Sequence, residues 1–184
     1  SGLAVSSAGD VNGDGVDDLI IGAPFYDNGG GTNNGAAFVV FGHKDVSFND
    51  TDLAHFATGE MTGFKILGGT NTLLLGWAVS GAGDVNNDGF DDVIVGVNPA
   101  SGTLKGFAYI IFGHPPPFFD VTSTSLSTPI TGVGYRIQGK FGTDKLGFAV
   151  GRAGDFNGDG YADIIVGAYG VDYTMRPDTG AAYV

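Results

Sequence analysis

The nine residues Asp84-Val-Asn-Asn-Asp-Gly-Phe-Asp-Asp92 decide the fold of this 184-residue chain, because the same pattern occurs three times. The other copies are Asp10-Val-Asn-Gly-Asp-Gly-Val-Asp-Asp18 and Asp155-Phe-Asn-Gly-Asp-Gly-Tyr-Ala-Asp163. The first Asp recurs after 74 residues (84 − 10) and then after 71 (155 − 84). A repeat of this length can hold one small sheet, so the sequence predicts a series of similar units.

Each repeat contains short apolar segments between glycines, a pattern typical of β-strands. A first segment leads into the acidic motif, and a second, mostly β-branched segment follows it, as expected for a strand covered on both faces. A third segment is rich in aromatic residues, and a fourth, present in the first two repeats, alternates polar and apolar residues. In the second repeat these segments are Gly76-Trp-Ala-Val-Ser80, Val93-Ile-Val-Gly-Val97, Gly106-Phe-Ala-Tyr-Ile-Ile-Phe-Gly113 and Gly134-Tyr-Arg-Ile-Gln-Gly139.

Four such strands form a small antiparallel sheet whose apolar faces need a neighbouring sheet on each side, which describes a β-propeller blade. The sequence therefore predicts an all-β fold with two full blades, residues 1–74 and 75–145, and a partial third blade, residues 146–184. These blades would belong to a larger propeller or assembly. Because the arc leaves an apolar face at each end, we expect other propeller blades or copies of the chain to cover them.

Composition excludes several classes of function. The net charge is −12, yet 11 of the 20 acidic residues lie in the three motifs, so much of the acidity is local. The 8 Lys and Arg residues form no cluster, which argues against a nucleic-acid partner. No apolar run has membrane-spanning length, and no signal peptide is visible. The absence of Cys leaves the redox compartment open.

The acidic motif places side-chain oxygens at positions 1, 3, 5 and 9 and glycine at position 6, which suits Ca²⁺. Three bound ions would bring the net charge from −12 to about −6. In a competing interpretation the motifs are ordinary hairpin turns whose Asp and Asn side chains cap their own backbone. Three copies in phase favour calcium. An EF-hand is excluded because position 12 is Ile21, Val95 or Val166 rather than an acid.

These features resemble the FG-GAP repeats of integrin-α-type β-propellers, most closely the long-repeat secreted versions of bacteria and protists. The resemblance rests on the Asp-x-Asn-x-Asp-Gly loop and on the openings Gly76-Trp77 and Gly147-Phe148, whereas Gly2-Leu3 departs from it. It implies a propeller, usually of seven blades, with Ca²⁺ in the hairpin loop between the first two strands of each blade. The implied ligands are Asp10, Asn12, Asp14, the carbonyl of Val16 and Asp18; Asp84, Asn86, Asp88, the carbonyl of Phe90 and Asp92; and Asp155, Asn157, Asp159, the carbonyl of Tyr161 and Asp163.

We therefore expect a non-enzymatic, extracellular or cell-surface module for adhesion, surface structure or protein assembly, with three structural Ca²⁺ ions and a protein or glycan ligand. No Ser-His-Asp or Cys-His set indicates catalysis. One alternative is a carbohydrate-binding or accessory domain of a secreted phospholipase or polysaccharide lyase, since some proteins with FG-GAP repeats are such enzymes. Another alternative is a subunit of a filament or surface layer.

Three further features remain open. His43 and His114 are equivalent in the repeat, which explains them more simply than a transition-metal site would. The segment Pro115-Pro-Pro-Phe-Phe119 could dock a partner, but we favour packing against its own blade. Asn49-Asp-Thr51 is a glycosylation sequon, meaningful only in a secreted protein of a glycosylating source.

Overall fold

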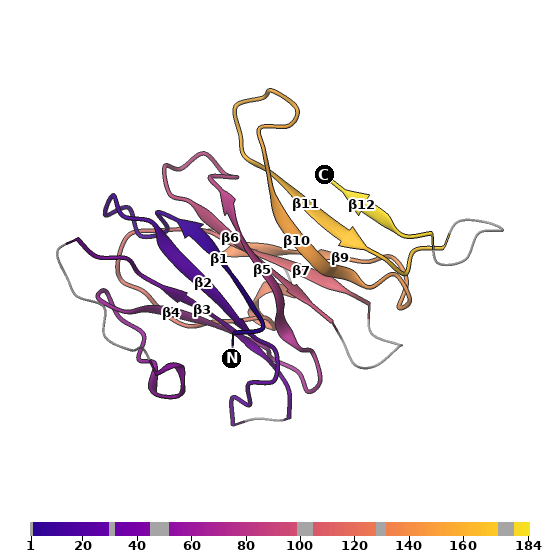
Figure 1. Cartoon of the computed structure of the whole chain (residues 1–184), viewed down its shortest axis with the longest axis horizontal. Helices are drawn as coiled ribbons and strands as arrows, with labels where there is room; N and C mark the ends of the chain where they lie inside the picture. Colours follow the sequence, from indigo (N-terminus) through magenta and orange to yellow (C-terminus); the bar gives the residue numbers. More distant parts are fainter. Residues whose placement is uncertain (1, 30–31, 45–51, 99–104, 128–131, 173–178) are drawn as a thin grey trace.

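The computed structural model describes residues 2–29, 32–44, 52–98, 105–127, 132–172 and 179–184, which contain three successive β-sheets (Figure 1). The sequon at Asn49 lies outside these residues. The first sheet holds β1 (Ala4–Gly9), β2 (Asp18–Ala23), β3 (Ala36–Val40), β4 (Gly63–Leu67) and β8 (Val121–Thr122); the second holds β5 (Leu75–Gly83), β6 (Asp92–Val97), β7 (Phe107–Ile111) and β9 (Gly134–Gln138); the third holds β10 (Leu146–Gly154), β11 (Asp163–Ala168) and β12 (Ala181–Tyr183).

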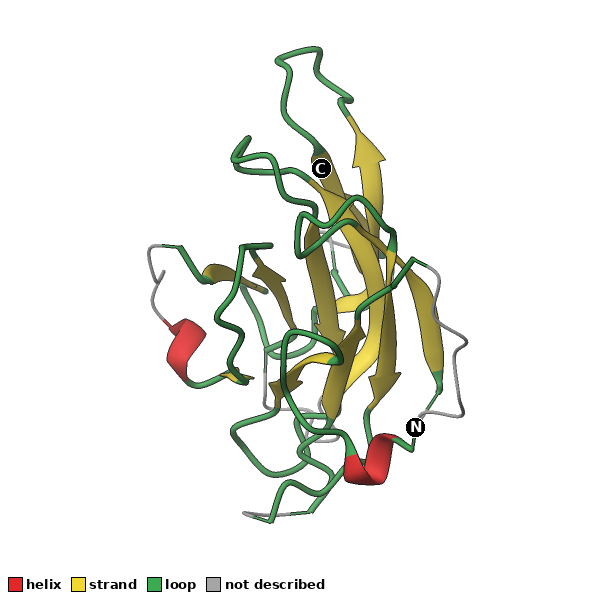
Figure 2. Ribbon diagram, turned by 90° about the vertical axis from the view of Figure 1, so that its left-hand side faces the viewer, coloured by secondary structure: helices red, strands yellow, loops and turns green. Residues whose placement is uncertain are grey.

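Neighbouring strands pair antiparallel within each sheet, except that β8 pairs parallel with β4, and this arrangement confirms the all-β fold and its blade-like sheets. The only helices in the described parts of the chain are two short 3₁₀ turns, η1 (Leu53–His55) and η2 (Ser125–Ser127), which lie outside the sheets (Figure 2). No helix among the described residues is long and apolar enough to cross a membrane.

Burial of the second strand depends on how many neighbours its sheet has. All six residues of β6, in the middle sheet, are buried, as its continuous apolar sequence predicts. The equivalent strands of the outer sheets each expose a large side chain, Leu19 of β2 and Ile165 of β11. Leu3, Val5 and Tyr183 are also about half exposed or more. Both ends of the arc therefore present apolar surface.

Glycines set the separation between neighbouring sheets. A Cβ atom built on Gly22 would lie 2.1 Å from the carbonyl oxygen of Gly76, and one built on Gly96 would lie 1.9 Å from that of Gly147. The first strand of each sheet thus packs with its backbone directly against the second strand of the preceding sheet. This close approach buries the apolar side chains between sheets, which form one core between the first and second sheets and another between the second and third.

A strap between two sheets is a feature that the sequence did not predict. We define the inter-blade strap as residues Phe118–Ser123, which follow β7 in the second repeat but contact the first sheet. The Phe118 ring lies 4.5 Å from that of Phe41 and stacks on Phe64 at 6.3 Å between centroids. The expectation that this loop packs on its own blade was therefore only partly right. Phe118 and Phe119 both stack on His114 of their own repeat, but Phe118 also packs on the preceding blade, where Phe41 and Phe64 offer an aromatic surface.

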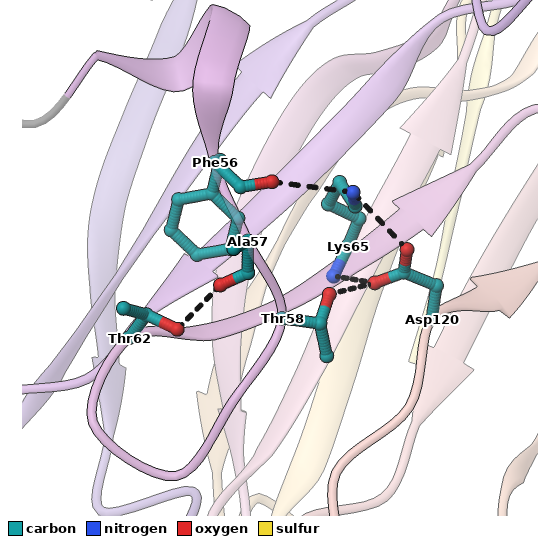
Figure 3. Close-up of polar contacts among 6 residues, drawn as sticks. All are labelled: Phe56, Ala57, Thr58, Thr62, Lys65 and Asp120. Carbon is teal, nitrogen blue, oxygen red and sulfur yellow. Dashed lines mark hydrogen bonds and ion pairs between the residues drawn. The ribbon is translucent and has the colours of Figure 1, made fainter.

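Polar contacts hold the strap to β4 (Figure 3). Asp120 accepts a hydrogen bond from the backbone N–H of Lys65 at 3.0 Å and forms an ion pair with its ammonium group at 3.2 Å. The hydroxyl of Thr58 donates to the same carboxylate, and the N–H of Ser123 donates to the Leu67 carbonyl at 2.8 Å. Between these contacts β8 pairs parallel with β4, so the strap extends the first sheet by a fifth strand.

Replacing Asp120 by alanine is expected to destabilise the protein by about 1–3 kcal/mol, because the half-buried charge of Lys65 loses its partner. Urea denaturation followed by circular dichroism measures this change. Glu60→Ala, in the exposed loop before β4, serves as the control and should change stability by less than about 0.5 kcal/mol. A double-mutant cycle with Lys65→Met should give coupling between the two residues, and a coupling near zero would contradict the role assigned to the ion pair.

Candidate metal-binding loops

The three acidic motifs form the hairpin loops β1–β2, β5–β6 and β10–β11, between the first two strands of each sheet. The loops also touch one another. The N–H of Asp91 donates to the carbonyl of Asp10 at 3.1 Å, and the N–H of Ala162 donates to the carbonyl of Asp84 at the same distance. Neighbouring loops are therefore held in a row by equivalent backbone bonds.

Position 1 of each motif organises its loop. In the first loop, Oδ1 of Asp10 accepts hydrogen bonds from the N–H groups of Gly13 (2.8 Å) and Asp14 (3.0 Å), while Oδ2 accepts from Gly15 (2.9 Å). Asp155 makes the same three contacts in the third loop. Because a carboxylate has about four lone-pair sites, the three bonds leave acceptor capacity for a further ligand.

The side chains at positions 3 and 5 accept hydrogen bonds from the backbone of their own loop. The Asn12 carbonyl Oδ1 accepts from the N–H of Asp14 at 2.9 Å, and Oδ1 of Asp14 accepts from Val16 at 2.9 Å. The second and third loops repeat both contacts within 0.2 Å. The capping of the backbone by Asp and Asn side chains, which the turn interpretation requires, is thus present in all three loops.

Glycine at position 6 is required by the backbone. Its φ angle is +82° in Gly15, +94° in Gly89 and +92° in Gly160, in the left-handed region that favours glycine. The bend lets the N–H of this glycine reach Oδ2 of the aspartate at position 1 in all three loops.

Position 9 joins the loop to the body of the sheet. Asp18 is completely buried, and its carboxylate accepts from the N–H of Val11 at 3.0 Å and from that of Gly42 at 2.8 Å. Asp92 makes the same pair of bonds with Val85 and Gly113, both at 2.8 Å. Each carboxylate therefore ties the start of its loop to the end of the third strand.

Position 9 of the third loop has different contacts. Asp163 is only partly buried, and its carboxylate accepts from the N–H groups of Phe156 at 2.8 Å and Asn157 at 3.2 Å. Among the described residues, the carboxylate of Asp163 thus accepts from its own loop, whereas Asp18 and Asp92 also accept from Gly42 and Gly113 at the ends of the third strands.

Burial and like charge disfavour ionisation at position 9. Burial, and to a smaller extent repulsion from Asp14 and Asp10, raise the pKa of Asp18 to about 6. The same causes, with Asp88 and Asp84 as the neighbouring charges, raise the pKa of Asp92 to about 7. The carboxylates at positions 1, 5 and 9 of one loop thus lie close enough to repel, and a bound cation would relieve this repulsion.

The residues that each motif implies as ligands lie in one loop, but their side chains do not converge on a common point. Among the described residues, no group of three or more His, Asp or Glu side chains is gathered as a metal-ligating cluster. The side chains at positions 1, 3 and 5 instead accept N–H groups of their own loop. Their donor set of carboxylate and amide oxygens nevertheless fits a hard divalent cation.

Position 8 has a role that the sequence did not suggest. Oδ2 of Asp91 accepts a hydrogen bond from the N–H of Asp10 in the neighbouring loop at 2.9 Å. In the third repeat this position is Ala162, which retains only the backbone contact between loops. The role of position 8 thus depends on its contact with another repeat, which no local sequence pattern reveals.

Comparison with known proteins places these loops and sheets in a family. The FG-GAP repeat family model matches residues 1–40, 75–111 and 148–184, which include all three acidic motifs. The chain therefore belongs to the FG-GAP repeat family, as its sequence resemblance indicates.

Integrin alpha subunits are among the similar proteins. Integrin alpha-5 of Xenopus laevis is 31% identical over 173 residues, which cover 92% of this chain and 15% of the relative. Integrin alpha-E of Mus musculus is 33% identical over 168 residues, covering 86% of this chain and 12% of the relative. Integrin alpha-V of Gallus gallus is 29% identical over 177 residues, covering 91% and 15%. The chain thus spans at most 15% of the length of these relatives.

Proposed function

We propose that this chain contributes blades to an extracellular, non-enzymatic β-propeller that serves adhesion, cell-surface structure or protein assembly. The blades would comprise residues 1–74, 75–145 and 146–184. Membership of the FG-GAP family and the similarity to integrin alpha subunits support this proposal. The observation that carries it is the recurrence of one acidic loop, with the same conformation, at the same hairpin of three successive sheets.

Each loop would hold one structural Ca²⁺. The ligands would be the oxygen side chains at positions 1, 3, 5 and 9 and the carbonyl of position 7, with water completing the coordination. Three carboxylates per loop would then be balanced by two positive charges. The proposed ligand residues are Asp10, Asn12, Asp14, Val16 and Asp18; Asp84, Asn86, Asp88, Phe90 and Asp92; and Asp155, Asn157, Asp159, Tyr161 and Asp163.

Binding of the ion to each loop would stabilise the folded blades. An ion that binds only the folded state adds RT ln(1 + [L]/Kd) to stability. With 1 mM Ca²⁺ and a Kd of about 10⁻⁴ M, typical of weak extracellular sites, each loop contributes about 1.4 kcal/mol. Three loops together would contribute about 4 kcal/mol.

Calcium is accordingly expected to raise the melting temperature by about 10 °C for a domain of this size. Differential scanning calorimetry in 1 mM CaCl₂ and in EDTA measures the shift, with 1 mM MgCl₂ as the control because Mg²⁺ adapts poorly to such a site. Equal melting temperatures in CaCl₂ and EDTA would refute the proposed ion sites.

A charge-only substitution separates calcium binding from turn capping. Asp88→Asn keeps an oxygen that can accept the N–H of Phe90 but removes a negative charge from the second loop. We expect this variant to lose about one of three bound ions in isothermal titration calorimetry and to melt nearly normally in EDTA. The matched control is Asp17→Asn at the exposed position 8 of the first loop. Equal destabilisation of Asp88→Asn with and without calcium would instead support a capped turn.

The exposed ends of the arc support a role in assembly. Val5 and Leu19 at one end and Ile165 and Tyr183 at the other would be covered by further blades or by other copies of the chain. Sedimentation analysis of the 184-residue chain tests this, since a folded monomer at all concentrations would argue against coverage by copies. Hydrolysis or elimination of glycans or lipids by the purified chain would contradict the non-enzymatic assignment.

A further inference from the structure

The two junctions between neighbouring acidic loops are built differently. At the first junction the carboxylate of Asp91, at position 8 of the second loop, accepts the N–H of Asp10 at 2.9 Å. A Cβ atom built on Gly9 would lie 2.2 Å from Oδ2 of Asp91, so this carboxylate fills the space over the glycine. Gly81 of β5, which lies beside the backbone of the first sheet, contributes no side chain there.

The second junction has the opposite charge at the equivalent place. Position 8 of the third loop is Ala162, and Arg152 of β10 replaces Gly81 of β5 in the repeat. The guanidinium carbon and Nε of Arg152 lie 2.9 Å from a Cβ atom built on Gly83, which is the equivalent of Gly9. A hydrogen-bond acceptor over the glycine of the first junction is thus replaced by donors at the second.

These donors have no acceptor among the described residues. The N–H of Asp84 is equivalent to that of Asp10, but the side chain of Ala162 has no oxygen to accept it. Arg152 is exposed and forms no ion pair with a described carboxylate. Both loops and their strands β5, β6, β10 and β11 are described without gaps. The two junctions therefore differ through residue type.

A cavity of about 240 Å³ lies beside these donors, lined by both loops and by Arg152. Three aspartates, Asp84, Asp91 and Asp155, also line it. Their carboxylates are engaged elsewhere, because Asp91 accepts the N–H of Asp10 and the other two accept N–H groups of their own loops. The guanidinium group and the N–H of Asp84 therefore remain for a ligand.

We propose that the second junction binds a carboxylate group, supplied by an Asp or Glu side chain of a partner or by a small carboxylate ion. One oxygen accepts the N–H of Asp84, as Oδ2 of Asp91 accepts the N–H of Asp10. The other oxygen accepts charge-assisted hydrogen bonds from the guanidinium group of Arg152. The first junction supports this arrangement, since a carboxylate already lies between two such loops there.

The negative charge of the neighbouring aspartates opposes the binding of an anion. Calcium in the second and third loops would neutralise much of this charge. A carboxylate is therefore expected to bind more tightly in CaCl₂ than in EDTA, and by linkage it raises the affinity for calcium by the same factor. This calcium dependence rests on the proposed function, whereas the contact with Arg152 does not.

Acetate, titrated at constant ionic strength into the ¹⁵N-labelled chain in 1 mM CaCl₂, probes the site directly. We expect saturable binding with a Kd of about 10 mM and shifts of the Asp84 amide and Arg152 Nε–H signals. Arg152→Gln should weaken binding at least tenfold. Lys140→Gln, which removes an exposed charge between β9 and β10, is the control and should not change it. Absence of saturable shifts, or equal affinity in Arg152→Gln, would overturn the proposal.

Ala162→Asp tests the site from within the chain, because position 8 is already Asp17 in the first loop and Asp91 in the second. The new carboxylate is expected to fill the site, to abolish acetate binding and to raise the melting temperature in CaCl₂ by about 2–4 °C. Combination with Arg152→Gln should remove most of this gain. A lowered melting temperature, or undiminished acetate binding, would contradict the proposal.

Two further measurements identify the source of the carboxylate and separate this proposal from the calcium sites. Tighter binding of acetyl-Gly-Asp-Gly-amide than of acetate would indicate a partner's side chain, and equal binding a small ion. Calcium is titrated separately by calorimetry. If calcium binds and acetate does not, this inference alone fails. If acetate binds equally in CaCl₂ and EDTA and no calcium binds, the proposed ion sites fail and the carboxylate site stands.

Discussion

Replacing Gly96 by alanine is expected to destabilise the protein by about 3 kcal/mol or more, one of the largest effects of any single methyl group in this chain. The added Cβ would lie 1.9 Å from the carbonyl oxygen of Gly147 in the neighbouring sheet. Because this contact is with backbone, no side-chain rotation relieves it, and the second and third sheets must separate. Chemical denaturation monitored by tryptophan fluorescence checks this, since Trp77 packs 5.7 Å from Phe148 across the same interface.

The repeat supplies a matched control for this substitution. Gly167 occupies the equivalent position of the third sheet, but a Cβ atom there would meet only Ala149 of its own sheet, at an ordinary contact distance of 3.4 Å. Gly167→Ala should therefore change stability by less than about 1 kcal/mol in the isolated chain. Equal effects of the two substitutions would show that the strand conformation, rather than contact between sheets, requires glycine.

Loss of the Asp92 side chain is expected to destabilise the protein by about 3–5 kcal/mol. Asp92→Ala leaves the N–H groups of Val85 and Gly113 without their acceptor in a completely buried position, and each orphaned group costs about 1–3 kcal/mol. Part of this loss of stability is offset, because burial already disfavours the ionised form of Asp92 and raises its pKa. Urea denaturation in EDTA isolates the hydrogen-bond contribution from any bound cation.

The third repeat again provides the comparison. Asp163→Ala removes the same side chain from a partly buried site, where water can replace the carboxylate, so a loss of about 1 kcal/mol is expected in EDTA. A loss as large as that of Asp92→Ala would mean that the loop turn, rather than the link to the third strand, depends on position 9. In CaCl₂ both variants should lose additional stability if position 9 also binds the ion.

Most of the fold follows from local patterns. The segments from Gly134 to Gly139 and from Val93 to Val97 were predicted as strands and form β9 and β6. Their glycine borders and β-branched residues act on their own backbone, so one repeat is enough to place them. The acidic loops are local for the same reason, since Asp10 caps N–H groups only three to five residues away. Whether the loops bind calcium stays a prediction.

Contacts between repeats could not be predicted in this way. Asp120 meets Lys65 across 55 residues of sequence, and Asp91 meets Asp10 across 81, with no periodic pattern to indicate either pair. The strap packs on the first blade because that blade offers an aromatic surface to Phe118 and a strand edge to Val121 and Thr122. Only the packed sheets contain that information.

The sequence by itself determined the repeat, the strands within it and the acidic loop, because hydrophobic patterning and turn chemistry act over a few residues. The tertiary structure decided which strand edges are covered, which acids are buried and which glycines touch a neighbouring sheet. Gly96 and Gly167 occupy the same position of the repeat, but among the described residues the backbone of another sheet lies against Gly96 and not against Gly167. Similar local sequences therefore have different energetic roles, depending on whether a neighbouring sheet packs against them.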